Sequence, residues 1–147
     1  MLFRSARSQM LGPEQYLTAC YAHLNRRTRR LSVVSAGHPP LIIVSPSGQT
    51  QTLEMDSSAL GMFSALVLQH KEVTVLPGDR FFLYSDGLIE SSPGHRRGEG
   101  LGRLIGSCID NRTECLSTAV SAIADEIQAG ADTIEDDWLL LGVEVPR

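Results

Sequence analysis

An aspartate–glycine pair stands at the end of a strand-like apolar segment. Residues 80–83 read Arg-Phe-Phe-Leu, and Tyr84-Ser85-Asp86-Gly87 follows directly. A carboxylate at the end of a buried strand is costly unless a hydrogen bond, a positive charge or a metal ion compensates it. A turn, a helix cap and a metal site are three interpretations of Asp86. In each of them Gly87 lets the backbone turn sharply.

Two more aspartates, Asp136 and Asp137, stand directly before the apolar segment 138–145. If this segment and 80–85 are neighbouring antiparallel strands, the end of one lies beside the start of the other. The carboxylates then converge at one sheet edge, and carboxylates without a Cys or His pattern favour a hard cation such as Mg²⁺ or Mn²⁺. The competing interpretation is an Asp-Gly turn and a solvated acidic loop.

Gly37-His38-Pro39-Pro40 lies between two predicted strands and predicts a rigid, kinked connection, because proline fixes its own φ and restricts the preceding residue. We favour His38 as a structural residue whose ring bonds the backbone; the alternative is a hydrogen-bonding or acid–base group at the edge of a site. Glu90 is either a supporting residue behind Asp86 or an acid in the first turn of a helix.

Composition predicts one soluble domain spanning residues 1–147: 42% of the residues are apolar and 20% are charged. Apolar runs fall short of the ~20 residues that a membrane helix needs, and residues 1–11 lack the apolar stretch of a secretory signal. Three scattered cysteines indicate reduced thiols, so we expect a cytoplasmic protein without a membrane partner.

The net charge of −4 gives no indication of nucleic-acid binding. Arginines nevertheless gather at two places, residues 26–30 and 96–97. The simpler interpretation is a solvated turn in each case. The alternative is a docking surface for an acidic or phosphorylated partner.

Hydrophobic periodicity predicts strands followed by two helices and a last strand, which is an α+β fold with helices packed on a sheet. Helical spacing runs from Leu101 to Ile109 and from Leu116 to Ile127. Thr113 is the predicted N-cap of the second helix and Gly130 its stop. The predicted strands pair as hairpins and comprise residues 16–24 with 31–35, 41–44 with 50–53, 67–76 with 80–85, and finally 138–145. Asp79 is expected to cap the turn between the last two of these hairpin strands.

Four segments in this order resemble one family: SAGHPPLIIV, ALGMF, VLPGDRFFLYSDGLIES and EDDWLLLGVEV. They are similar to the bacterial branch of the metal-dependent PPM-type protein phosphatases, which includes stage II sporulation protein E and the Rsb sigma-regulating phosphatases. The resemblance covers residues 16–145, and the ordered set is far more specific than any single motif.

The resemblance implies an antiparallel β-sandwich flanked by helices that hydrolyses phosphoserine or phosphothreonine on proteins. A binuclear Mn²⁺ or Mg²⁺ centre would activate a water as the nucleophile. Asp86 and Asp136 would be metal ligands, Asp137 would be the fallback, and Gly87 would allow the backbone geometry. No side chain is assigned as a catalytic group, and His38 and Glu90 are supporting residues at most. The implied partner is a phosphoprotein such as an anti-sigma factor antagonist.

The chain's main departure from this family is the absence of its upstream segment; a smaller one is Leu139, where relatives usually have threonine. Relatives carry an earlier Asp-Gly ligand pair and a Gly-Asp…Gly-His-Gly segment upstream of the position of Tyr16, whereas the first aspartate here is Asp56. We therefore expect a domain that lacks its N-terminal strands, as the C-terminal part of a longer phosphatase. The alternatives are a second chain that supplies the missing half, or a non-catalytic domain that binds a regulatory partner. Unpaired strand edges would favour self-association.

Overall fold

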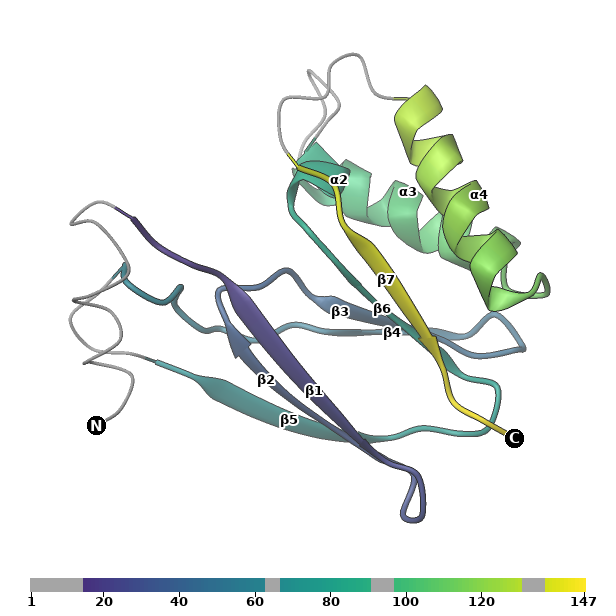
Figure 1. Ribbon diagram of the computed structural model, residues 1–147, viewed down its shortest axis with the longest axis horizontal. Coiled ribbons are helices and arrows are strands. Elements are labelled where there is room, and N and C mark those ends of the chain that lie inside the picture. Colours follow the sequence, from purple (N-terminus) through teal and green to yellow (C-terminus); the bar gives the residue numbers. More distant parts are fainter. Residues whose placement is uncertain (1–14, 63–66, 91–96, 131–136) are drawn as a thin grey trace. The chain divides into compact units, whose positions relative to one another are not determined.

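Two antiparallel sheets and a group of helices form the part of the chain that the computed structural model describes, residues 15–62, 67–90, 97–130 and 137–147 (Figure 1). One unit of the chain comprises residues 1–38 and 55–74, and the other comprises residues 39–54 and 75–147. Each unit contains one of the two sheets. The predicted α+β class is confirmed by these elements.

The first unit contains a three-stranded sheet in the order β1-β2-β5. Strand β1 spans Ala19–Asn25, β2 spans Arg30–Ala36 and β5 spans Gln69–Thr74. The β1–β2 hairpin confirms the predicted pairing of residues 16–24 with 31–35. Alternate residues of β2 are fully buried, as expected for a strand with one face in a core; they are Leu31, Val33 and Ser35.

The second unit contains a four-stranded sheet in the order β4-β3-β6-β7. Strand β3 spans Leu41–Val44 and β4 spans Thr50–Leu53, which are the predicted bounds. Strand β6 spans Arg80–Tyr84 and β7 spans Leu140–Glu144. The helices are α2, Gly87–Glu90, α3, Arg97–Asp110, and α4, Leu116–Ala129.

Helices α3 and α4 lie on one face of this sheet and bury a continuous apolar core (Figure 1). Gly142 in β7 allows the close approach of α4, because a Cβ there would lie 2.8 Å from the Val120 Cγ2 atom. The sheet residues follow the period of two and the helix residues the period of three to four that the sequence predicted. The core side chains are Ile42, Val44, Phe82, Tyr84, Leu88, Leu104, Cys108, Ile123 and Ile127.

The predicted hairpin of residues 67–76 with 80–85 is wrong. Strand β5 pairs with β2, whereas β6 pairs with β3 and β7. The turn between them does form, with Gly78 at a φ of 89° and the Leu76 N–H donating to Asp79 Oδ2 at 2.7 Å. Its backbone bonds the end of the last strand instead: Gly78 N–H donates to Val145 O, and Val145 N–H donates to Asp79 O. Since both edges of β6 are occupied, β5 has no edge to pair with.

Helix ends differ from the prediction at one position. Cys115, not Thr113, is the N-cap of α4, because the N–H of Ala119 bonds the Cys115 carbonyl and Cys115 has extended backbone angles. Gly130 is the C-cap, as predicted. Among the described residues, no helix has the length and apolar character that crossing a membrane requires.

Arg80 joins three elements at the first residue of β6. Its Nε and Nη2 atoms both lie 2.8 Å from Glu144 Oε2 in β7. Nη2 also donates to the Glu114 carbonyl at 2.6 Å and Nη1 to the Asn111 carbonyl at 3.3 Å, both in the α3–α4 connection. The Arg80 side chain is only 8% exposed and that of Glu144 is 37% exposed. A buried guanidinium with this many acceptors is stable only while the acceptors stay in place.

Replacing Arg80 by Ala should lower the free energy of unfolding by about 3 kcal/mol, because it leaves a half-buried carboxylate and two carbonyls without their donor. Urea denaturation followed by circular dichroism measures the loss. The matched control is Arg30→Ala, which removes the exposed Arg30–Glu72 pair, at side-chain exposures of 58% and 40%. That change should lower the free energy of unfolding by less than ~1 kcal/mol. Equal losses in the two variants would contradict the role given to Arg80.

Candidate functional site

The last residues of β6 and the first residues of β7 lie side by side, as the sequence predicted. Tyr84 is opposite Leu140 in the antiparallel register. The pairing continues one step beyond the strands, because the Ser85 N–H donates to the Leu139 carbonyl at 3.1 Å. Asp86 and Asp137 therefore belong to the same end of the four-stranded sheet.

The Ser85 hydroxyl binds the two segments together a second time. It donates to the Asp137 carbonyl at 2.8 Å and accepts the Leu139 N–H at 2.9 Å. The hydroxyl thus extends the pairing of the two segments beyond the last backbone bond, in the way that a side chain can replace backbone hydrogen bonds. Sequence reasoning missed Ser85 as a positioning residue, because its partners lie far away in the sequence.

Asp86 has an exposed side chain and also begins helix α2. Its carbonyl accepts the N–H groups of Ile89 and Glu90, and its Oδ1 accepts the Gly87 N–H at 3.1 Å. Oδ2 meets no hydrogen-bond donor of the described residues. Gly87 itself is buried. The chain therefore turns into a helix directly after Asp86, whose carboxylate is exposed.

Tyr84 holds the preceding position in the apolar core. Its side chain is fully buried among the residues of α3 and α4, and this burial, more than the nearby Cys108 and Glu54, raises the pKa of its phenol. Tyr84 is therefore a neutral anchor for the end of β6 and not a titrating group of the site.

The carboxylates fit Mn²⁺ or Mg²⁺ in their chemistry, since both ions prefer oxygen ligands. Asp86 and Asp137 are both exposed, so neither carboxylate is buried in the core. Across the stretches of chain that the structure describes, no cluster of three or more His, Cys, Asp or Glu side chains gathers. Asp136, the second predicted ligand, lies outside the described residues. The described residues therefore match Mn²⁺ or Mg²⁺ in the type of ligand atom and in its place at the end of the sheet. They do not form a complete coordination shell.

Glu90 is exposed and ends α2, so its position as an acid in the first turn of a helix is observed. His38 lies in the other unit. There the Ser57 hydroxyl accepts the Gly37 N–H at 3.1 Å and donates to Ser35 Oγ, and Ser35 Oγ accepts the His38 N–H at 3.3 Å. These contacts fix the backbone before the two prolines.

Gly37 is required in this connection. It has a φ of 69°, and a Cβ at this position would lie 2.8 Å from the Ala59 nitrogen. Serine hydroxyls, which the motif alone did not indicate, thus hold the backbone of Gly37 and His38, and the rigidity of the whole connection stays a prediction. The roles of His38 and Glu90 as supporting residues stay predictions.

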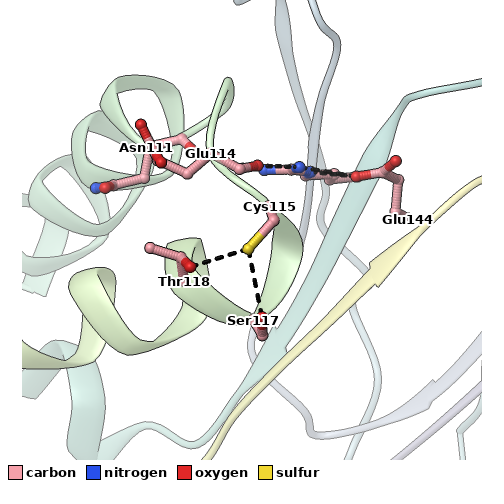
Figure 2. Close-up of polar contacts among 7 residues, drawn as sticks. Asn111, Glu114, Cys115, Ser117, Thr118 and Glu144 are labelled. Atoms are coloured by element: carbon pink, nitrogen blue, oxygen red, sulfur yellow. Dashed lines mark hydrogen bonds and ion pairs between the residues drawn. The ribbon is translucent and has the colours of Figure 1, made fainter.

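Cys115 is a chemically distinct group that sequence reasoning did not single out (Figure 2). The thiol is exposed and lies 3.4 Å from Ser117 Oγ and 2.9 Å from Thr118 Oγ1 at the start of α4. Hydrogen bonds from Ser117 and Thr118 lower the pKa of Cys115 to about 7. Burial, by contrast, raises the pKa of Cys108 to about 12 and that of Cys20 above its usual value.

Comparison with known proteins gives one family for most of the chain. The family model described as stage II sporulation protein E (SpoIIE) matches residues 3–146. The phosphoserine phosphatase RsbP of Bacillus subtilis (strain 168) is 33% identical over 75 residues, which are 51% of this chain and 19% of RsbP. The matched segment thus covers about a fifth of the length of this relative.

Solved structures share the fold. The RsbU and RsbW domains of Rv1364c from Mycobacterium tuberculosis match with a TM-score of 0.81 and 21% identity, over 99% of this chain and 41% of that one. The phosphatase domain of SpoIIE from Bacillus subtilis, Mn presoaked, matches with a TM-score of 0.71 and 13% identity, over 99% and 64%. At these identities the two structures show the fold alone, and the predicted PPM-phosphatase-like fold is confirmed.

Replacing Ser85 by Ala should lower the free energy of unfolding by about 1–2 kcal/mol, because the Asp137 carbonyl and the Leu139 N–H lose a common partner. Ser85→Thr keeps the hydroxyl and should recover most of the stability. Ser47→Ala serves as the control, since it removes one exposed Ser45–Ser47 hydrogen bond. Urea denaturation compares the three variants. A Ser85→Ala variant as stable as Ser47→Ala would contradict the role of the Ser85 hydroxyl in joining the two segments.

Cys115 should be alkylated by iodoacetamide well before Cys20 and Cys108 at neutral pH, because only the thiolate reacts. The rate should rise with pH and reach half its maximum near pH 7, the pKa of Cys115. Thr118→Val removes one of the bonds that lower this pKa and should shift the half-point to higher pH. Peptide mass spectrometry over a pH series measures each cysteine. A half-point unchanged by Thr118→Val would contradict the stated cause.

Proposed function

The chain belongs to the stage II sporulation protein E family, a branch of the PPM-type phosphatases, and we propose that it hydrolyses phosphoserine or phosphothreonine on a regulatory protein with the help of Mn²⁺ or Mg²⁺. One observation carries the proposal. The segment that leads from β6 to Asp86 and the segment that leads from Asp137 into β7 are bound to each other through both the backbone and the side chain of Ser85.

Asp86 would hold the cation together with Asp136, and Asp137 is the fallback for the second position. Bound divalent cations orient a phosphoryl group, offset its charge and lower the pKa of an attacking water. The chain's own residues supply the frame. Helix α2 begins at Gly87, directly after Asp86, the Ser85 hydroxyl bonds the two segments to each other, and Tyr84 anchors the strand in the core.

The proposed substrate is a phosphoprotein, for example an anti-sigma factor antagonist. The support is the sequence similarity to RsbP, which is named a phosphoserine phosphatase. The Mn-presoaked SpoIIE phosphatase domain supports the choice of cation. The rival proposal is a non-catalytic phosphatase-like domain that binds a regulatory partner, and self-association through strand edges remains a prediction under both. Edge strand β7 and the residue before it carry exposed apolar side chains on one face, Leu139 and Leu141.

Asp86→Asn should abolish Mn²⁺-dependent hydrolysis of p-nitrophenyl phosphate by the purified chain. Loss of a partner behind a metal ligand already costs 10–100-fold, so loss of a ligand should cost at least about 100-fold. Calorimetric titration with Mn²⁺ should show weaker binding by the same variant. Asp125→Asn is the matched control, because it removes an exposed carboxylate from α4 and should leave both readouts unchanged.

The two readouts separate the proposals. Hydrolysis that requires Mn²⁺ and disappears in Asp86→Asn supports the enzyme. A folded protein that binds Mn²⁺ through Asp86 but hydrolyses nothing supports the binding domain. Asp86→Asn that matches the wild type in both assays rejects the metal role of this residue.

A further inference from the structure

The β1–β2 hairpin ends in a turn that contains four arginines within five residues, Asn25 to Arg30 being Asn-Arg-Arg-Thr-Arg-Arg (Figure 1). All six of these residues are exposed. The hairpin belongs to the first unit, and neither the core nor the carboxylate site uses it. This turn is therefore the strongest concentration of positive charge that the proposed function leaves unexplained.

The turn has a defined backbone. The Asn25 Oδ1 atom accepts the N–H groups of Arg27 and Thr28, each at 3.1 Å, and this pattern stabilises a turn locally. Arg29 has a φ of 55°, a region that Gly or Asn enters more readily than Arg. The arginine side chains are thus presented from a fixed turn and not from a loose loop.

Only one of the four guanidinium groups is neutralised within the structure. Arg30 Nε lies 3.2 Å from Glu72 Oε2 in the adjacent strand β5, and the other oxygen of Glu72 accepts the Ser32 hydroxyl. The side chains of Arg26, Arg27 and Arg29 form no ion pair with any described residue. Three positive charges therefore remain on one turn of a chain whose net charge is −4.

We propose that Arg26, Arg27 and Arg29 form a docking surface for an acidic, phosphorylated segment of a partner protein. Guanidinium groups bind carboxylates and phosphates through paired N–H···O hydrogen bonds. Three of them on a short rigid turn match a short anionic segment better than an extended surface. The proposal deepens the proposed function, on which it rests for the identity of the partner as the phosphoprotein substrate.

A nucleic acid is a poorer match for this turn. Nucleic-acid surfaces combine an extended positive stripe with aromatic residues for stacking, whereas the turn contains no aromatic residue and the chain is acidic overall. A membrane is poorer still, because residues 25–30 include no apolar side chain that could enter the lipid interface.

The test is the binding of a fluorescein-labelled phosphoserine peptide with acidic flanks, followed by fluorescence anisotropy at low salt. The variant Arg26→Gln/Arg27→Gln/Arg29→Gln should bind about tenfold more weakly, the sum of three exposed charge contacts. The wild type should bind a phosphoserine peptide with neutral flanks less tightly than the acidic peptide, because only the phosphate is then left for the three guanidinium groups. High salt should remove the difference between the two proteins, because exposed charges are screened.

The matched control is Arg30→Gln/Lys71→Gln/Arg147→Gln, which lowers the net charge equally at exposed positions outside the proposed surface. It should retain wild-type affinity. An equal loss of affinity in this control would show that net charge alone explains the binding, and would overturn the proposal. A single-stranded oligonucleotide that binds more tightly than the peptide, and loses this affinity in the turn variant, would also overturn it in favour of nucleic acid.

Hydrolysis of p-nitrophenyl phosphate separates this proposal from the proposed function. The small substrate has no acidic flank, so the turn variant should hydrolyse it at the wild-type rate. If the wild type binds the acidic peptide through the turn but hydrolyses neither substrate, docking stands and the enzyme proposal fails. If hydrolysis is normal and the turn variant binds the peptide as tightly as the wild type, docking fails and the enzyme proposal stands.

Discussion

The pairing of β6 with β7 is the constraint on which the second unit depends, because each end of the pair is fastened by a side chain. At one end the Arg80 guanidinium bonds Glu144 and two carbonyls of the α3–α4 connection. At the other end the Ser85 hydroxyl bonds the Asp137 carbonyl and the Leu139 N–H. A one-residue slip between these strands would exchange their faces, and both fastenings would be lost together with the alignment of the two acidic segments.

The helices stabilise this register from one side of the sheet. Phe82 and Tyr84 in β6 point into the core that α3 and α4 complete, and Gly142 leaves the space that α4 occupies. The same strand therefore serves two environments, an apolar core up to Tyr84 and an exposed carboxylate at Asp86. Burial of the strand rigidifies its end, and a rigid strand end is a better support for ligands than a loop.

The arginine turn, residues 25–30, is ordered by local contacts and not by a core. Its order comes from local hydrogen bonds of Asn25. Among the ion pairs between described residues, only that of Arg30 with Glu72 of β5 neutralises its charge. Arg30 and Arg80 are each paired with a glutamate, but only Arg80 is buried. Only the Arg80 pair is therefore expected to contribute much to the free energy of unfolding. The exposed arginines of the turn are available to a partner.

Local patterns in the sequence determined the strands and helices, the two short hairpins, the Gly130 cap and the Asp79 turn, because all of these depend on neighbours close in the chain. The family motifs likewise pointed to Asp86. Tertiary structure alone decided how β5 and β6 pair with the other strands. Residues 67–76 and 80–85 look like a hairpin, yet β6 is occupied on both edges by β3 and β7, which lie far away in the sequence. The hydrogen bonds of Ser85 and the buried ion pair of Arg80 could not be predicted, since their partners lie far away in the sequence. The pKa of Cys115 depends on Ser117 and Thr118, which are close in the sequence but meet the thiol only in the geometry of the helix start.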